Sequence, residues 1–171
     1  ENAAIFCHAA TFLIVANCMA GRGNKAYQAM RKIMPNAQKN QALYKTEPYV
    51  YAEYLFGAEH PYASGEGAFS WITGTAAWSF MAGVEWLLGI RHDYEGLRID
   101  PCLPSSWKKA FVRRPFRGNT YNITIENPQG VEKGIKEILV DGKPVQGNLI
   151  VPQWACKTVE IRVLMGKINV S

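Results

Sequence analysis

The hydrophobic periodicity of this sequence changes once, near residue 92, and this change limits the folds that the chain can adopt. Residues 3–20 are rich in Ala, Phe, Leu, Ile and Val and contain no proline, which is typical of a buried helix. Residues 120–126 instead alternate apolar and polar side chains, as a half-buried strand does. The sequence therefore predicts an α+β protein, with helices in residues 1–92, strands in residues 93–171 and a boundary between Arg91 and Gly96.

Three helices are predicted in the first part, over residues 3–20, 24–34 and 75–88. Gly21 follows the first of them as a C-terminal cap, and Asn24 is the expected N-cap of the second. The second helix ends before Pro35, because proline cannot continue a helix. Residues 45–73 are dense in aromatic residues and glycines and show no clear periodicity.

The second part is predicted to contain strands over residues 98–100, 111–116, 120–126, 135–140, 148–151 and 157–164. Asp141-Gly142 directly follows one of these runs and is the pair that favours a tight hairpin. Because turn signals recur about every ten residues, we expect an antiparallel β-sandwich.

The net charge of +5 arises mainly from the second part, where 12 Lys and Arg face 8 Asp and Glu after residue 92, a net of +4. This excess is compatible with a polyanion-binding surface or with a solvated strand face, and we expect the latter and no nucleic-acid partner. Five of the cations lie close together in one strand-like segment: Lys108, Lys109, Arg113, Arg114 and Arg117.

The four cysteines are far apart and form no C-x-x-C pair, so we expect reduced, buried thiols and neither a metal site nor a disulfide framework. No run approaches the roughly 20 apolar residues that span a bilayer, and the first residues lack a signal-peptide pattern. We therefore expect a cytoplasmic protein with no membrane partner.

The segment from Ser70 to Trp78 is a candidate anion site, because a glycine-containing turn runs into a long apolar helix. The first N–H groups of a helix lack internal partners, and Thr73 and Gly74 could add a hydroxyl donor and a close backbone approach. The alternative is that a threonine merely caps the helix. His8, set in the first apolar helix, could likewise be a binding residue or a satisfied core side chain.

Glu47, Tyr51 and Glu53 belong to a nine-residue segment with two carboxylates and three tyrosines, which could hold sugar hydroxyls and stack on sugar faces or could be an ordinary loop. Glu66, between glycines, is predicted to lie in a mobile loop, and His60 and His92 are predicted to lie at the surface.

Four stretches in this order resemble the C-terminal part of glycoside hydrolase family ninety-four, the inverting disaccharide phosphorylases that act on cellobiose, cellodextrins and chitobiose. They are residues 1–8, 47–51, 70–78 and 97–104. The resemblance implies that residues 1–92 are the last helices of an (α/α)6 barrel and that residues 93–171 form a β-sandwich cap. It also implies that His8, Thr73 and Gly74 bind inorganic phosphate. Glu53 stands where some members have a glutamine that contacts the donor sugar.

The resemblance further implies cleavage of a β-glucoside such as cellobiose by phosphate, giving α-glucose 1-phosphate, with phosphate as co-substrate and no cofactor. Phosphate is already a nucleophile, so one carboxylic acid is enough where an inverting hydrolase needs two carboxyl groups. In the family that acid is an Asp in an earlier part of the barrel. We therefore expect no general acid within this chain and no phosphorolysis by the chain alone.

Two other functions are open at this point: a carbohydrate-binding or structural module without catalysis, and the phosphorylase-like end of a cyclic β-glucan synthase. The length of 171 residues also bears on the choice, because three helices cannot close a twelve-helix barrel. We expect the missing N-terminal part of the same protein as a partner, and a second copy of the chain as a further candidate.

Overall fold

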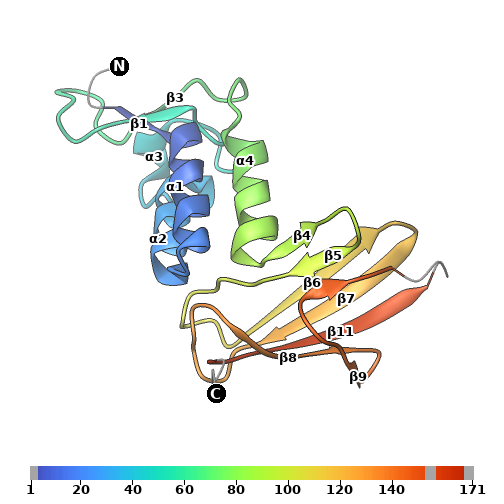
Figure 1. The fold of residues 1–171 in the computed structure, drawn as a ribbon. Helices are drawn as coiled ribbons and strands as arrows, with labels where there is room; N and C mark the ends of the chain where they lie inside the picture. The colour runs from blue at the N-terminus through green and yellow to red at the C-terminus, as the bar shows by residue number, and fades with distance from the viewer. Residues whose placement is uncertain (1–3, 153–156, 168–171) are drawn as a thin grey trace.

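The chain folds into a helical part followed by a part made of β-strands (Figure 1). The computed structural model describes residues 4–152 and 157–167. Each part contains its own hydrophobic cluster, and Trp107 packs against both of them. This mixture of helices and separate sheets confirms the α+β class.

The helical part contains α1 (Cys7–Met19), α2 (Gly23–Ile33), the 3₁₀ turn η1 (Pro35–Ala37), α3 (Gln41–Tyr44), α4 (Thr75–Met81) and the π-helical turn η2 (Ala82–Leu87). The three predicted helices are present, and α4 with η2 forms the third. The first begins later than predicted, because residues 4–6 form strand β1 and the N–H of Cys7 donates to the carbonyl of Glu53 at 2.8 Å. Pairing with a distant strand thus overrides the local helical preference.

Asn24 does not cap α2, which corrects the sequence prediction. Arg22 is the residue before the helix, whereas the Asn24 side-chain oxygen accepts hydrogen bonds from the backbone N–H and the hydroxyl of Ser105, at 3.0 and 3.2 Å. The backbone N–H of Asn24 donates to Glu132 at 2.8 Å. Its polar groups therefore join α2 to two loops of the strand part, a use that helix capping rules cannot foresee.

A small antiparallel sheet lies at the N-terminal end of α1. It consists of β1 (Ala4–Phe6), β2 (Tyr54–Phe56) and β3 (Gly67–Ala68), with β2 in the centre. The buried Tyr44 hydroxyl fastens the loop before β2, because it donates to the carbonyl of Val50 at 2.9 Å and accepts from the N–H of Ala52 at 3.1 Å. Residues 45–73, which show no periodicity in the sequence, thus contain the two short strands β2 and β3, and the Tyr44 side chain fixes the loop before β2.

The strand part contains a three-stranded sheet in the order β10-β5-β4 and a five-stranded sheet in the order β6-β7-β11-β8-β9. The strands are β4 (Ile90–His92), β5 (Leu97–Ile99), β6 (Lys109–Phe116), β7 (Asn119–Glu126), β8 (Ile135–Val140), β9 (Lys143–Pro144), β10 (Leu149–Ile150) and β11 (Thr158–Met165). Side chains of both sheets form one hydrophobic cluster. Strands β4 and β9 were missed by the sequence analysis. The six predicted strands are present, β8 with the predicted bounds and the other five with shifted ends.

The five-stranded sheet is not purely antiparallel, which corrects the prediction. Strand β11 pairs parallel with β7, from Thr158 opposite Thr120 to Leu164 opposite Glu126, and antiparallel with β8. Apolar alternation gives the buried face of a strand but not its direction or its neighbour. A strand that is distant in sequence therefore occupies the centre of this sheet.

Two hairpins of the sheet have two-residue turns in the left-handed region. Asp141 and Gly142 join β8 to β9 with φ of 47° and 78°, so the hairpin predicted from this pair is confirmed. Arg117 and Gly118 join β6 to β7 with φ of 47° and 78°. Positive φ at both positions matches the right-handed twist of the flanking strands.

The cations of β6 do not share one surface. Arg113 is exposed on one face, while Arg114 is half-buried on the other and its Nε atom is buried without a hydrogen-bond partner. Arg117 donates to the carbonyl of Tyr94 at 2.8 Å. This division favours a strand with structural and solvated cations over a continuous polyanion-binding surface.

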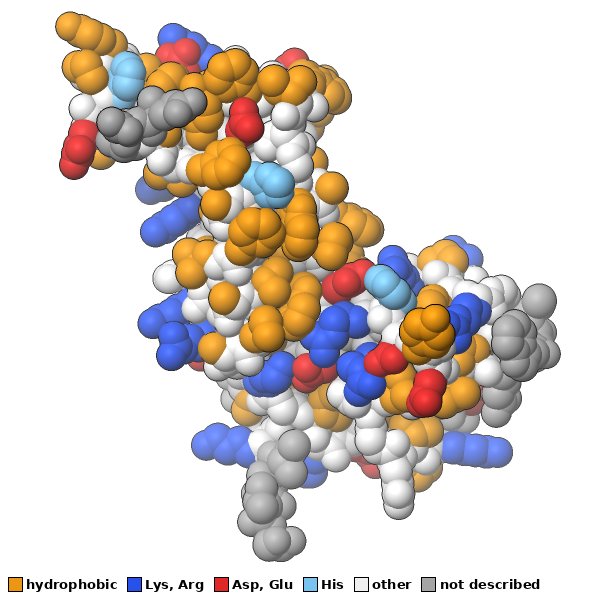
Figure 2. All heavy atoms as spheres, turned by 45° about the horizontal axis from the view of Figure 1, so that its top comes forward, with side chains coloured by type: hydrophobic (Ala, Val, Ile, Leu, Met, Phe, Trp, Pro, Cys, Tyr) orange, Lys and Arg blue, Asp and Glu red, His pale blue; other side chains and the backbone are white. Residues whose placement is uncertain are grey.

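The helical part carries an exposed apolar surface, visible as the orange side chains over the upper half of Figure 2. Its larger members, more than 45% exposed, include Ile5, Phe6, Phe12, Leu13, Met19, Trp71, Ile72 and Phe80. Single exposed apolar residues are ordinary, whereas grouped ones are typical of surfaces that bind another molecule. Within the described ranges, no helix is long and apolar enough to cross a membrane.

Candidate functional site

The structure brings His8 and Gly74 into direct contact, although 65 residues separate them in the sequence. A Cβ atom added to Gly74 would lie 2.7 Å from Cε1 of His8, 3.0 Å from Nε2 and 3.1 Å from Nδ1. The imidazole therefore lies flat against the turn before α4, in space that only a glycine leaves free. Two parts of the predicted anion site are neighbours in the fold.

Thr73 and Thr75 place two hydroxyl groups beside this contact. Their Oγ1 atoms are 2.7 Å apart, and the Thr73 oxygen also accepts a hydrogen bond from the N–H of Thr75 at 3.1 Å. The first intrahelical bond at this end is donated by Trp78 to the carbonyl of Gly74, at 3.0 Å. Thr73 thus serves the helix start, as the capping alternative proposed, and it does so next to the imidazole.

The Nε2 atom of His8 is buried and has no hydrogen-bond partner among the described residues. The ring lies between three aromatic side chains, with centroid distances of 6.0 Å to Phe6, 5.6 Å to Phe12 and 6.2 Å to Trp78. Leaving a buried polar atom unpaired costs about 1–3 kcal/mol. A polar ligand group bound to this nitrogen would remove that cost, and both residues that flank Gly74 carry hydroxyl groups.

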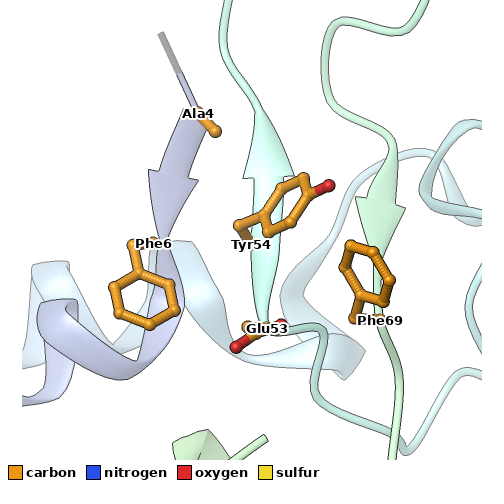
Figure 3. A pocket seen from close by; sticks show the side chains of 5 residues that line it. All are labelled: Ala4, Phe6, Glu53, Tyr54 and Phe69. Carbon is orange, nitrogen blue, oxygen red and sulfur yellow. The ribbon is translucent and has the colours of Figure 1, made fainter. Parts of the chain in front are cut away.

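A pocket of about 490 Å³ opens over the small sheet (Figure 3), and the ring of Phe6 in its lining is the one whose centroid lies 6.0 Å from that of His8. Its lining consists of Ala4 and Phe6 from β1, Glu53 and Tyr54 at β2, and Phe69 after β3. In Figure 3 the Glu53 carboxylate lies between the rings of Phe6 and Phe69, with Tyr54 above it. Flat aromatic faces with one acceptor group are suited to a ligand with apolar faces and hydroxyls, such as a sugar.

Glu47 and Tyr51 lie apart from this pocket. The Glu47 carboxylate accepts a hydrogen bond from the indole N–H of Trp71 at 2.9 Å, and this bond lowers the Glu47 pKa. Tyr51 packs against the helical cluster, and burial raises its pKa. Of the three predicted sugar-binding residues, the structure thus brings only Glu53 to the pocket.

The other three singled-out residues lie elsewhere. Glu66 forms an ion pair with Lys45 at 2.7 Å. His60 is half-buried and its Nδ1 accepts from the backbone N–H of Ala63 at 3.0 Å, so it organises a loop. His92 is exposed as predicted and lies 3.2 Å from Glu85.

Phe6 and Phe69 line the pocket and were not singled out from the sequence as sugar contacts, whereas Tyr54 is one of the three tyrosines of the predicted segment. Phe69 has a φ of 54° and Trp71 a φ of 72°, a conformation that bulky residues seldom adopt. Such strain persists only where the surroundings fix the backbone, and it gathers at binding sites. Aromatic density was the available signal, but only the fold shows which rings share a pocket.

No group of three or more His, Cys, Asp or Glu side chains that could hold a metal ion occurs among the described residues. The site instead combines an imidazole, two hydroxyls, a close glycine and a neighbouring aromatic pocket with one carboxylate. Chemically, these groups are suited to a ligand that carries hydroxyl groups and a polar or anionic group.

Comparison with known proteins identifies the family of the chain. Residues 1–89 match the model of the glycosyl hydrolase 94 superfamily, catalytic domain. The chain therefore belongs to the glycosyl hydrolase 94 superfamily.

Its curated relatives include phosphorylases and a glucan synthase. The chain is 41% identical to the solabiose phosphorylase of Paenibacillus borealis, over 94% of this chain and 21% of the relative. It is 38% identical to the N,N'-diacetylchitobiose phosphorylase of Vibrio proteolyticus, over 97% of this chain and 21% of the relative. It is 34% identical to the cyclic β-(1,2)-glucan synthase of Rhizobium meliloti, over 73% of this chain and 4% of the relative. The chain thus spans about a fifth of the length of the phosphorylases that it matches.

Proposed function

We propose that this chain is the phosphate-binding part of an inverting glycoside phosphorylase, which cleaves a β-linked disaccharide with inorganic phosphate to give a sugar 1-phosphate. The contact between His8 and Gly74 carries the proposal, because the Nε2 atom of that imidazole is buried with no hydrogen-bond partner among the described residues, and the residues on either side of Gly74 carry hydroxyl groups. In this proposal His8, Thr73 and Gly74 hold the phosphate.

The chemistry of phosphorolysis explains the choice of groups. Phosphate attacks the anomeric carbon directly, so the protein must hold an anion on the face of the sugar opposite the leaving oxygen. Hydroxyl and imidazole N–H donors can do this without adding a negative charge that would repel the nucleophile. The adjoining pocket, with Glu53 and three aromatic rings, would receive the sugar that is attacked.

The acid that protonates the leaving oxygen lies outside this chain in our proposal. Glu47 is engaged with Trp71, and Glu66 with Lys45, which leaves Glu53 as the carboxylate at the pocket. We therefore expect the isolated chain to release no glucose 1-phosphate from cellobiose and phosphate. Detection of that product would contradict this assignment.

The exact substrate is a further proposal. Two of the phosphorylases that the chain resembles are named for solabiose and diacetylchitobiose, which supports a β-linked disaccharide as the substrate class, with cellobiose as one candidate. The likeness to the glucan synthase supports a second candidate, a phosphorylase-like segment of a polysaccharide synthase. A binding module without catalysis is less well supported, because sugar binding alone has no use for the orphaned nitrogen of His8. Location in the cytoplasm and pairing with a second copy stay predictions.

A chimeric enzyme tests the phosphate site directly. The homologous segment of the solabiose phosphorylase is replaced by this chain, and initial rates are measured at varied phosphate and at varied disaccharide. His8→Ala should lower kcat/KM for phosphate roughly 10- to 150-fold, because it removes one hydrogen bond to a charged group, worth about 1.5–3 kcal/mol. His92→Ala, at a side chain that is 66% exposed, is the matched control and should leave the rates unchanged.

An unchanged dependence on phosphate in an active His8→Ala chimera would overturn the proposal. If the wild-type chimera is inactive, phosphate protection of the isolated chain against thermal unfolding replaces the kinetic measurement. Equal protection of the wild-type and His8→Ala chains would then refute the site.

A further inference from the structure

Strand β6 is an edge of the five-stranded sheet, because within the described residues it pairs with β7 on one side and with no strand on the other. The pairing keeps one continuous register over all eight residues of β6, from Lys109 opposite Glu126 to Phe116 opposite Asn119. Strands β7 and β11, which are equally long, have neighbours on both sides. Strand β6 is thus a long and regular edge strand.

The hydrogen bonds to β7 show which backbone groups of β6 face outward. The N–H of Asn127 donates to the carbonyl of Lys108 at 2.8 Å, so Lys108 is a hydrogen-bonded position of the pair. Hydrogen-bonded and free positions alternate along two antiparallel strands. The backbone groups of Lys109, Phe111 and Arg113 therefore point away from β7, and no backbone hydrogen bond joins them to another described residue. Each of these residues offers one donor and one acceptor.

Pro115 limits the length of this open edge. It is the next outward-facing residue, and it has no N–H to donate to an added strand. Beyond it, the Arg117 side chain donates to the carbonyl of Tyr94 at 2.8 Å, which holds another loop at this end of β6. The part of the edge that can pair fully therefore consists of residues 109–113.

The side chains of the three outward-facing residues lie on the exposed face of the sheet. Phe111 is 64% exposed, and it lies between the cations Lys109 and Arg113. Neither cation forms an ion pair with a described residue, whereas Glu126, opposite Lys109, is paired with Arg162 at 2.6 Å. The open edge thus presents a cation, an aromatic ring and a second cation.

A second copy of this chain fits the edge poorly. Two β6 strands can pair antiparallel through all three outward-facing residues in one register, with Phe111 opposite Phe111. That register places Lys109 of each copy opposite Arg113 of the other, and like charges directly opposite each other destabilise an antiparallel pair. The edge is instead suited to a strand with carboxylates at the two outer positions, since these would neutralise both cations.

We propose that residues 109–113 bind an extended acidic segment of a partner protein, which adds to the sheet as a sixth strand beside β6. The backbone of the segment pairs with Lys109, Phe111 and Arg113. Its carboxylates lie opposite the two cations, and an apolar side chain between them covers the ring of Phe111. Main-chain hydrogen bonds supply the affinity, and the alternating side chains supply the specificity. This surface goes beyond the proposed function and does not depend on it.

Fluorescence anisotropy with the whole 171-residue chain and labelled peptides tests the surface. The acidic peptide is Thr-Glu-Thr-Val-Thr-Glu-Thr, and the basic peptide has lysine in place of both glutamates. We expect the acidic peptide to bind at least about 5-fold more tightly, because two attractive cross-strand pairs replace two repulsive ones. N-methylation of its valine removes one backbone donor without a change of charge and should weaken binding at least about 3-fold.

A charge reversal locates the binding at β6. The double variant Lys109→Glu with Arg113→Glu should prefer the basic peptide. Lys25→Glu with Arg31→Glu, at two exposed cations of α2, is the matched control and should keep the preference for the acidic peptide. The comparison of peptides on the unaltered chain stands even where a variant fails to fold.

Equal affinities for the acidic and basic peptides, or no binding of either at millimolar peptide, would overturn the proposal. An N-methylated peptide that binds as tightly as its parent would do so as well, because the attraction would then be ionic without strand addition. A dimer of the chain that Phe111→Pro dissociates in sedimentation would also overturn it, since a second copy would then occupy this edge.

Discussion

The contact between His8 and Gly74 can be tested by adding one carbon atom. In Gly74→Ala the new methyl group would lie 2.7 Å from Cε1 of His8, closer than real Cβ atoms approach other atoms. Gly74 has a φ of −71° and a ψ of −5°, which alanine adopts without strain. The substitution therefore acts on the imidazole rather than on the backbone.

The size of the effect follows from the geometry. Ordinary contact begins at 3.4 Å, so the ring must retreat by 3.4 − 2.7 = 0.7 Å. A retreat of this size lengthens a hydrogen bond of about 2.9 Å beyond the range in which it counts as one. Loss of one bond to a charged ligand costs about 1.5–3 kcal/mol, or roughly 10- to 150-fold in phosphate affinity.

Two measurements separate this effect from unfolding. Phosphate-dependent rates of the chimeric phosphorylase give the loss of affinity, and urea unfolding of the isolated chain gives the change in stability. Alanine reduces the entropy of the unfolded chain, worth about 0.4–1 kcal/mol, which offsets part of the strain. Gly83→Ala is the matched control, because its Cβ would meet only Met30 at 3.6 Å, an ordinary contact distance.

Wild-type phosphate dependence in a folded Gly74→Ala chimera would refute the reasoning, since the imidazole would then have no part in binding. Equal losses in Gly74→Ala and Gly83→Ala would refute it as well, because the loss would then come from the α4–η2 segment as a whole.

Three further predictions concern stability. Tyr44→Phe should lower the unfolding free energy by about 1–3 kcal/mol, because two backbone groups of the loop before β2 lose their hydrogen-bond partner. Urea titrations measure this loss. Tyr49→Phe is the control, and it should not change the unfolding free energy because that ring is 76% exposed. Hydrogen bonds from Arg98 and from the N–H of Tyr94 lower the pKa of Asp93 in the folded state. The carboxylate therefore stabilises the fold above about pH 4, and this contribution is lost as the pH falls through the lower folded pKa. In Asp93→Asn, the Tm should fall less steeply than in the wild type when the pH is lowered through this range. Gly142→Ala should cost about 1 kcal/mol from backbone conformation alone, since φ is 78° and nothing lies within 4 Å of the new Cβ, and calorimetry that finds no loss would contradict this.

The sequence was sufficient for features that depend on near neighbours along the chain. The change of period separated helices from strands, Pro35 marked the end of α2, and Asp141-Gly142 predicted a two-residue hairpin. Each of these rests on a local preference that the fold did not oppose.

The features that failed depend on distant partners. Residues 4–6 form a strand because they pair with residues 54–56. The Asn24 side chain does not cap α2 because it accepts a hydrogen bond from the N–H of Ser105. The sequences of α1 and α2 contain no signal of these distant contacts. Propensity yields to tertiary contacts at such places.

The candidate site was predicted in part. Residue types and the helix start singled out Thr73, Gly74 and His8, and the resemblance implied a phosphate-binding role for them; the fold places His8 against Gly74. The pocket was predicted only through Glu53 and the segment that ends at Tyr54, because Phe6 comes from a strand that the sequence did not reveal. The rings of Phe6 and Tyr54 lie together because β1 pairs with β2, and a pairing between such distant residues cannot be predicted from local sequence patterns.

The central place of β11 has a consequence for biosynthesis. A ribosome releases β6, β7 and β8 well before Thr158–Met165, yet β7 and β8 meet only through this later strand. Until it emerges, the facing edges of both strands expose unpaired backbone groups, which are templates for pairing with other nascent chains. Translation of residues 119–157 is therefore the interval in which this protein has most need of a chaperone.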